Sequence, residues 1–459
     1  MRIMGTHSSS GAPISGTSTS GTPISGASIA GVETAWSDLR ALVGAEHMRA
    51  ASREDAVDGI LPQMVIEPGN PDEVASALKI ATAAGLKVIP RGGATKMDWG
   101  NPPRSGELPG GELILSTRRL NRVVEHAWGD MTATVEAGCT FQQLQQTLAE
   151  HGQRLALDPL WPNQATIGGI LATNDSGPLR IRFGSLRDLI IGIKLALPDG
   201  TLAKSGGKVV KNVAGYDLPK LATGSLGTLG IITQAIFRLH PVPRETRTLS
   251  FSDSDSGTSD GGRMHALVLA IQDCNMVPTG VQVRAGSAST PEIDLRFEGT
   301  ATGCEAQIEQ SLRLSSGARR IESPADVWNA HSTLWSGAEP SVVCKLSLLP
   351  AELGTFLDLI RKASEALHLT WRFVAQAVGV GYLRLEGTDT DALLHALQDL
   401  RTKLETRGDA LVILRGPLEV KSKMDVWGSA GDALALMRNI KAQFDPTGVL
   451  NPGRFIGGI

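Results

Sequence analysis

Cysteine is scarce in this sequence. The chain of 459 residues has four cysteines, at positions 139, 274, 304 and 344, which are far apart and form no CxxC pair. Disulfide frameworks, iron–sulfur clusters and zinc sites need paired or closely spaced ligands, so we expect neither a disulfide nor a metal site in this chain. We predict buried or inert thiols in a reducing cytoplasm.

Long apolar segments and a strong charge imbalance are missing as well. No apolar run is long enough to span a bilayer, and the N-terminus lacks the apolar core of a signal peptide. The formal net charge is −3, which does not indicate a nucleic acid partner. These absences favour a cytoplasmic protein without direct membrane insertion, so that any membrane association would come through partners.

Four common functional signatures are also absent. No GxGxxG follows a predicted strand, which removes support for a nicotinamide-binding Rossmann fold. The P-loop pattern GxxxxGK(S/T) is missing, and residues 206–209 (Gly-Gly-Lys-Val) do not satisfy it. The GxSxG and HExxH motifs are missing too.

Glycine, by contrast, is abundant, with 52 residues. Such a content is typical of many tight turns, or of backbone that comes close to a ligand. Residues 1–31 are rich in Ser, Gly and Thr and contain a short duplication, at residues 11–16 and 21–26. Because so small and polar a unit cannot bury a core, we predict a disordered tail there.

The remaining sequence predicts an α+β protein. Capping residues Asn70 and Thr140, each followed three residues later by Glu or Gln, predict helix starts with capping boxes. Strands are predicted at residues 87–90, 113–115, 122–126, 132–136 and 189–197, and further helices at residues 353–367, 391–407 and 433–444.

Composition also divides the chain into domains. A boundary is predicted near Pro243, followed by a mobile polar loop at residues 249–263. We predict a first domain at residues 32–243, a smaller α+β cap domain at 244–425, and a segment at 426–459 that packs back on the first domain.

Two glycine-rich loops carry the clearest chemical signal. In the first, residues 90–96, two adjacent glycines follow a strand and stand beside Arg91, Thr95 and Lys96. Successive backbone N–H groups can then converge on an anion, with help from a hydroxyl and from cationic side chains. Taken alone, a plain tight turn explains this loop about equally well.

The second loop covers residues 159–184. Thr166 is placed to cap a short helix whose first turn contains Gly168 and Gly169, so a pyrophosphate could approach the free N–H groups and the positive end of the helix dipole. Thr173 and Asn174 add polar contacts. Glycines that pack a helix against a sheet are the alternative, but the density of small and polar residues favours a phosphate site.

A third segment, residues 207–239, has glycines at positions 224, 227 and 230, just before an apolar strand. This spacing suits backbone packed against a flat ring. A glycine-rich connection between core elements is the alternative.

These loops, in this order, resemble the FAD-binding domain of the vanillyl-alcohol oxidase / p-cresol methylhydroxylase (PCMH) family. Residues 91–95 resemble its first pyrophosphate loop, with Ala94 in place of a glycine, and residues 166–173 resemble its second. Residues 182–188, 198–200, 224–233 and 444–454 complete the set. The resemblance implies a PCMH-type two-subdomain FAD-binding domain with a smaller α+β cap domain.

The resemblance also implies the cofactor and its ligands. We expect FAD, bound non-covalently because no histidine occupies positions 94 or 95, where some relatives attach the flavin. The expected cofactor-binding residues are Pro90, Arg91, Gly92, Gly93, Ala94, Thr95, Lys96, Pro159, Thr166, Ile167, Gly168, Gly169, Ala172, Thr173, Asn174, Gly177, Arg182, Gly184, Gly227, Gly230, Ile231, Ile232, Asn451 and Arg454.

Within the family, residues 206–217 and Leu226 are most similar to the non-catalytic FAD-binding polypeptide of bacterial glycolate oxidase. Leu226 stands where the related catalytic subunits carry Glu. This similarity implies a complex with a homologous catalytic flavin subunit and an iron–sulfur subunit, which oxidises glycolate to glyoxylate and passes the electrons onward.

The catalytic residues stay unassigned. Oxidation of a 2-hydroxy acid needs a base, a cation for the carboxylate and the flavin as hydride acceptor. The family's catalytic subunits carry a His-Ala-Gly-Asp-Gly-Asn-like strand, whereas Gln376 stands at the matching position here, and an amide is no base near neutral pH. We therefore predict an accessory or electron-relaying subunit. The alternatives are a self-sufficient 2-hydroxy-acid (D-lactate-type) dehydrogenase and a non-catalytic scaffold.

Some charged residues are weaker candidates. Arg372, Arg384, Arg415 and Lys421 could hold a carboxylate, although each is more readily explained as an ordinary surface or strand-edge charge. The histidines at positions 240 and 331 are predicted to be structural.

Overall fold

The computed structural model describes residues 29–459, except 105–110, 209–215, 253–260, 315–317 and 323. The predicted tail and its duplication lie almost entirely outside the described residues, as does most of the predicted mobile loop. The first element, α1 (Ile29–Val43), begins three residues before the predicted start of ordered structure near Val32.

The first sheet has the strand order β1-β2-β4-β3. Its strands are β1 (Met48–Ala50), β2 (Met64–Ile66), β3 (Lys87–Arg91) and β4 (Glu112–Ser116), and α1 and α2 (Pro71–Ala83) share its core. The predicted cap of α2 is present, because the Asn70 side chain accepts a hydrogen bond from Glu73 N and Glu73 reaches back to Gly69 N.

The second sheet is antiparallel, with the order β5-β6-β10-β8-β9. It consists of β5 (Val123–Ala127), β6 (Thr132–Glu136), β8 (Ile190–Ala196), β9 (Leu202–Gly206) and β10 (Ile231–Arg238). Around it lie α3 (Phe141–Ala149), α4 (Ile167–Thr173), α5 (Arg180–Phe183), α6 (Leu186–Leu189), α7 (Leu218–Ala222) and the short pair β7 (Gln153–Arg154) and β11 (His240–Pro241). Thr140 caps α3 as predicted, but the capping box is wrong because the Gln143 side chain donates to Asn121 O instead.

The third sheet has eight strands, in the order β15-β12-β14-β13-β17-β18-β16-β19. They are β12 (Glu245–Ser252), β13 (Gly280–Gly286), β14 (Ser289–Gly299), β15 (Ala318–Arg320), β16 (Ser341–Ser347), β17 (Thr370–Gln376), β18 (Val380–Glu386) and β19 (Ala410–Arg415). The accompanying helices are α8 (Gly261–Asp273), α9 (Ala301–Leu312), α10 (Ala325–Trp328), α11 (Ala330–Thr333), α12 (Leu353–Ala366) and α13 (Thr390–Glu405).

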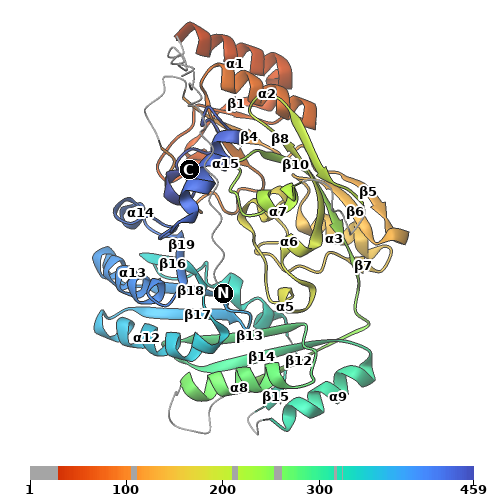
Figure 1. Cartoon of the computed structure of the whole chain (residues 1–459), viewed down its shortest axis with the longest axis vertical. Coiled ribbons are helices and arrows are strands. Elements are labelled where there is room, and N and C mark those ends of the chain that lie inside the picture. The colour runs from red at the N-terminus through yellow and green to blue at the C-terminus, as the bar shows by residue number, and fades with distance from the viewer. Residues whose placement is uncertain (1–28, 105–110, 209–215, 253–260, 315–317, 323) are drawn as a thin grey trace, which may run out of the picture.

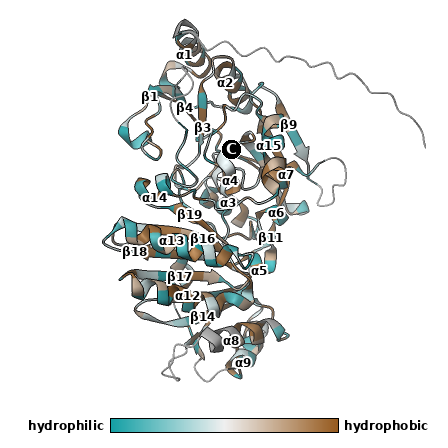
Figure 2. Ribbon diagram, turned by 60° about the vertical axis from the view of Figure 1, so that its left-hand side comes forward, coloured by the Kyte–Doolittle hydropathy of each residue, from teal (hydrophilic) through white to brown (hydrophobic). Residues whose placement is uncertain are grey.

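The two faces of this sheet have different surroundings. Alternate strand residues such as Val342, Cys344 and Leu346 share one core with residues of α8, α9, α12 and α13. The opposite face, which includes Val343 and Tyr382, packs against residues of the N-terminal half. Figures 1 and 2 show the eight-stranded sheet below the two N-terminal sheets.

After α14 (Leu418–Lys423), the chain returns to the N-terminal half through α15 (Ala433–Phe444), near the C-terminus in Figure 1. Residues 449–451 then extend the first sheet along β3: Val88 N donates to Val449 O, and Asn451 N donates to Val88 O, each at 2.8 Å. The β3 strand therefore pairs with a segment more than 350 residues later in the sequence. No helix among the described residues combines the length and hydropathy needed to cross a bilayer.

Candidate cofactor site

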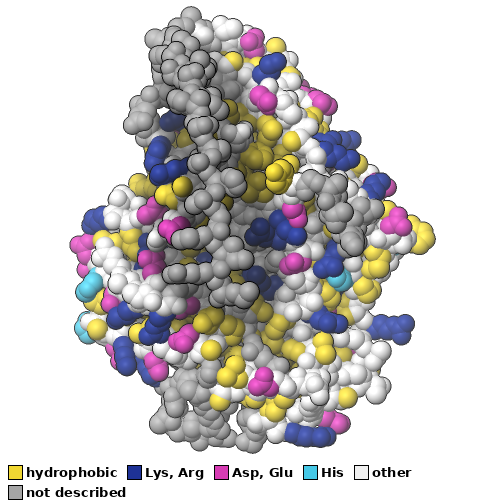
Figure 3. All heavy atoms as spheres, viewed as in Figure 1, with side chains coloured by type: hydrophobic (Ala, Val, Ile, Leu, Met, Phe, Trp, Pro, Cys, Tyr) yellow, Lys and Arg dark blue, Asp and Glu magenta, His cyan; other side chains and the backbone are white. Residues whose placement is uncertain are grey.

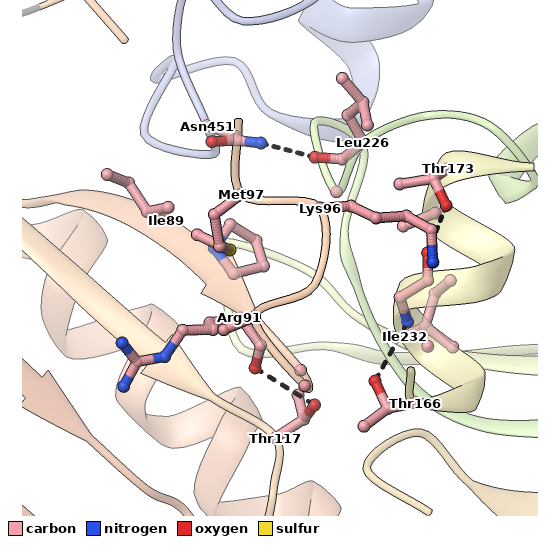
Figure 4. A pocket seen from close by; sticks show the side chains of 18 of the residues that line it. Ile89, Arg91, Lys96, Met97, Thr117, Thr166, Thr173, Leu226, Ile232 and Asn451 are labelled. Atoms are coloured by element: carbon pink, nitrogen blue, oxygen red, sulfur yellow. Dashed lines mark hydrogen bonds between the residues drawn. The ribbon is translucent and has the colours of Figure 1, made fainter. Parts of the chain in front are cut away.

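One pocket collects most of the predicted cofactor residues between the first two sheets and the returning C-terminal segment (Figure 4). It encloses about 780 Å³, including its open mouth. The predicted residues that line it are Pro90, Arg91, Gly92, Gly93, Ala94, Thr95, Lys96, Thr166, Gly168, Gly169, Ala172, Thr173, Gly227, Gly230, Ile231, Ile232, Asn451 and Arg454.

The first loop presents a run of free backbone donors to this pocket. Within the described part of the chain, the N–H groups of Gly92, Gly93, Ala94 and Thr95 donate no hydrogen bond. Ala94 has φ 60°, in the left-handed region, and alternating handedness is how successive N–H groups form a concave anion site. The arrangement suits a pyrophosphate.

The second loop lies directly against the first. The Thr166 hydroxyl accepts from Gly169 N at 3.4 Å and so caps α4 as predicted. A Cβ added at Gly92 would lie 2.1 Å from Thr166 Oγ1, and one at Gly93 would lie 1.9 Å from Gln164 O. Both positions therefore exclude any side chain, because the two phosphate-type loops touch there.

The C-terminal segment closes the pocket with polar side chains. Asn451 Nδ2 donates to Leu226 O at 2.6 Å (Figure 4), and Arg454 Nη2 donates to Met97 O at 2.6 Å. Asn451 Oδ1 and the Nε and Nη1 atoms of Arg454 are buried without a hydrogen-bond partner among the described residues. Orphaned buried polar atoms are costly, so these atoms fit the polar edge of a bound cofactor.

The side chain of Arg91 does not serve this pocket. Its guanidinium points away from the pocket in Figure 4 and pairs with Asp55 at 2.5 Å. Arg91, together with Arg49, holds the pKa of the Asp55 carboxyl far below its usual range. The prediction that cationic side chains assist the first loop is therefore wrong for Arg91, whose backbone alone lines the site.

Five lining residues were missed from the sequence: Ile89, Met97, Trp99, Thr117 and Leu226. Thr117 follows β4, and its N–H donates to Arg91 O at 2.8 Å. Parallel pairing of β3 with β4 could have indicated it, because equivalent ends of parallel strands lie together. The other four stand next to, or within, loops already identified.

Six predicted cofactor residues lie outside the lining and stay predictions. Ile167 is in the core beneath α4, Asn174 ends that helix with φ 47°, and Arg182 is exposed on α5. The others are Pro159, Gly177 and Gly184. Most of the run at 206–217 that carries the glycolate oxidase resemblance falls outside the described residues.

Beyond the pocket, three tryptophans join the two halves of the chain. Trp99 lines the pocket and stacks on Trp335 with ring centroids 5.6 Å apart, and Trp161 meets Trp335 edge to face at 5.1 Å. The Lys96 ammonium lies 5.4 Å from the Trp161 ring centroid and 5.7 Å from that of Trp99. This cluster therefore closes one side of the pocket with aromatic surface.

The cations proposed as carboxylate ligands are already paired. Arg384 and Lys421 are buried, so their prediction as surface or strand-edge charges is wrong: Arg384 Nε bonds Glu386 at 2.5 Å, and Lys421 Nζ bonds Asp58 at 2.7 Å. Arg415 pairs with Asp98. Arg372 pairs with Glu386, as the side chain of Arg384 does. None of the four offers a free cation.

Gln376 lies where the two halves meet. It is buried, its Nε2 donates to Ser176 O at 3.3 Å, and its Oε1 has no partner among the described residues. His331 is buried with its ring 6.3 Å from that of Tyr382, whereas His240 packs on Phe183. No group of three His, Cys, Asp or Glu side chains in the described residues is arranged to hold a metal ion.

Known sequences match this chain along most of its length. A model of the "FAD binding domain" family matches residues 62–206, and one of the "FAD linked oxidases, C-terminal domain" family matches residues 428–455. The chain is 36% identical over 430 residues to the mitochondrial D-lactate dehydrogenase (cytochrome) of Arabidopsis thaliana, covering 86% of this chain and 74% of that protein. It is 26% identical over 432 residues to the glycolate oxidase subunit GlcD of Bacillus subtilis, covering 86% and 89%.

Solved structures share the fold. The crystal structure of p-cresol methylhydroxylase with substrate bound superimposes with a TM-score of 0.72 at 15% identity, covering 94% of this chain and 97% of that one. The predicted PCMH-type α+β fold is confirmed.

Proposed function

Because the chain belongs to the family of FAD-linked oxidoreductases, we propose that it is the FAD-binding subunit of a glycolate oxidase-type complex. The complex would oxidise a small 2-hydroxy acid such as glycolate to the 2-oxo acid and pass the electrons to an iron–sulfur partner. The similarity to the Bacillus subtilis glycolate oxidase subunit supports the substrate class and the subunit role. We keep the predicted accessory or electron-relaying role for this chain.

The observation that carries the cofactor assignment is the run of four free N–H groups at residues 92–95, which faces the capped N-terminus of α4. Bound FAD would supply the hydride acceptor. The chain's own atoms would hold its pyrophosphate at these N–H groups, and the orphaned polar atoms of Asn451 and Arg454 would meet polar groups of the cofactor. The tryptophans at 99 and 335 exclude water from that side.

The accessory role rests on Gln376. Its amide stands where a catalytic histidine is expected and accepts no proton near neutral pH. It is held in place by Ser176 O. A homologous catalytic flavin subunit would then carry the substrate chemistry, and any membrane association would come through the partners.

The test uses the purified chain with its flavin, given glycolate or D-lactate anaerobically and then a dye acceptor. An accessory subunit keeps its oxidised flavin spectrum with both acids. Bleaching of the flavin in the isolated chain would instead establish the second candidate, a self-sufficient 2-hydroxy-acid dehydrogenase, which the similarity to the D-lactate dehydrogenase favours. Acid denaturation should release the yellow colour into the supernatant, since we propose non-covalent FAD.

A scaffold without a redox role is separated by a variant. Gly169→Val should remove FAD while the chain still assembles with its partners. If the complex keeps its activity without this FAD, the scaffold role holds and our proposal fails.

A further inference from the structure

Two cations at the boundary between the two halves have no partner. Lys345 lies on β16, and Arg180 begins α5, which packs against β13. Within the described residues, neither side chain takes part in an ion pair or a side-chain hydrogen bond. A cation that is removed from water without a partner is unfavourable, so an anion that reached this position would be stabilised.

A buried phenol lies beside them. Tyr382 is the direct strand partner of Lys345, so both side chains project from the same face, the one that also carries Val343 and packs on Trp335. Tyr382 is 2% exposed, and its hydroxyl has no hydrogen-bond partner among the described residues. Because burial raises the pKa of Tyr382, the phenol stays protonated and has a proton to donate.

Asp175 connects these groups to the cofactor pocket. Lys96 lines the pocket, and its Nζ lies 3.0 Å from Asp175 Oδ2. Burial lowers the pKa of Lys345, the Asp175 carboxylate opposes that shift, and Arg180 adds to it. The three charges are therefore within electrostatic reach of one another, next to the pocket.

The charges in this region do not balance. Lys96, Lys345 and Arg180 are positive, and Asp175 is the carboxylate among them. Asp158, which also acts on Tyr382, is already paired with an arginine of β14 at 3.1 Å. The excess positive charge fits a small carboxylate or dicarboxylate anion.

We propose that Arg180, Lys345 and Tyr382 form a carboxylate-binding site for a small organic acid beside the cofactor pocket. The two cations hold the carboxylate, and the phenol donates a hydrogen bond to it. Gln376, whose Oε1 has no partner, accepts from the hydroxyl of a 2-hydroxy acid. Only the identification of this acid as the oxidised substrate rests on the proposed function; anion binding does not.

The experiment is calorimetric titration of the flavin-containing chain with oxalate, a carboxylate that resembles the proposed substrates. We expect saturable binding by the wild type, and binding weakened about ten- to hundredfold in Lys345→Met and in Arg180→Gln, because each loses a charge-assisted hydrogen bond. Lys204→Met is the matched control: it removes one positive charge from an exposed position on β9 and should leave the oxalate Kd unchanged.

Tyr382→Phe keeps the test decisive if a charge variant fails to fold, since it deletes only the unpartnered hydroxyl. It should bind oxalate several-fold more weakly, with flavin content unchanged. The proposal is overturned if the wild type shows no binding, if all variants bind as the wild type does, or if Lys345→Met loses flavin but keeps its oxalate affinity. If oxalate binds as described and the chain never reduces its flavin with any acid, the anion site stands and the redox role of the chain fails.

Discussion

The ammonium nitrogen of Lys96 lies 3.0 Å from a carboxylate oxygen of Asp175, and the two side chains are 5% and 1% exposed. Asp175→Asn would leave the lysine charge buried without its counter-ion, so we expect the free energy of unfolding to fall by about 3–5 kcal/mol. The double variant Lys96→Met, Asp175→Asn should lose less than the sum of the two single losses.

Urea unfolding followed by tryptophan fluorescence measures these changes. Asp399→Asn is the control, because it removes one partner of the exposed Lys403–Asp399 pair and should cost no more than about 0.5 kcal/mol. Equal losses in the two aspartate variants would show that the buried pair has no special weight.

Gly169 should separate cofactor binding from folding. A Cβ at this position would meet only Thr166 Oγ1, at 3.3 Å, and otherwise points into the pocket. Gly169→Val should therefore weaken FAD binding at least about tenfold by overpacking, while the melting temperature of the flavin-free chain stays unchanged. Flavin content after gel filtration and fluorescence titration with FAD check this. Gly129→Val, with nothing within 4 Å of its Cβ, should keep FAD.

Lys441 should hold the returning segment in place. Its Nζ donates to Asp445 at 2.6 Å, to Thr228 O at 2.8 Å and to Leu450 O at 3.0 Å. Lys441→Met would leave the buried Asp445 carboxylate without its cation, so we expect a loss of about 3–5 kcal/mol and faster amide hydrogen exchange at residues 445–454. Lys423→Met, on the exposed face of α14, should change neither quantity.

His240 should make the fold sensitive to acid. Burial lowers its pKa below the ordinary value of 6.5, and the charges of Arg238, Arg154 and Arg182 lower it further. Below pH 6.5 the unfolded chain takes up a proton that the folded chain still refuses, so the free energy of unfolding falls as the pH falls through that range. Thermal melts between pH 5 and 7.5 should show a shallower decline in His240→Gln; parallel curves would assign the decline to other groups.

What could be predicted from the sequence was mainly local. The caps formed by Asn70 and Thr166 each join a side chain to a backbone N–H three residues later, so a short stretch of sequence contains both partners. The two glycine loops were recognisable for a similar reason, because their shape depends on residues that lack a side chain.

Long-range pairing was not predictable in this way. Arg91 turns to Asp55, and Trp99 stacks on Trp335, which comes from the other half of the chain. Arg384 was predicted as an ordinary charge because nothing near it in the sequence shows that Leu334 O and Ala338 O would accept its hydrogen bonds inside the protein. The unpaired Arg180 and Lys345 stayed unnoticed for the same reason.

The pairing of residues 449–451 with β3 has a consequence for the order of biosynthesis. A ribosome makes β3 and both phosphate-type loops early, but Asn451 and Arg454 follow only after the whole eight-stranded sheet has been made. A nascent chain would therefore present an incomplete pocket throughout most of translation, and FAD would be retained only after residues 449–454 have emerged and paired with Val88. Cofactor capture in this protein would be a late, post-translational event.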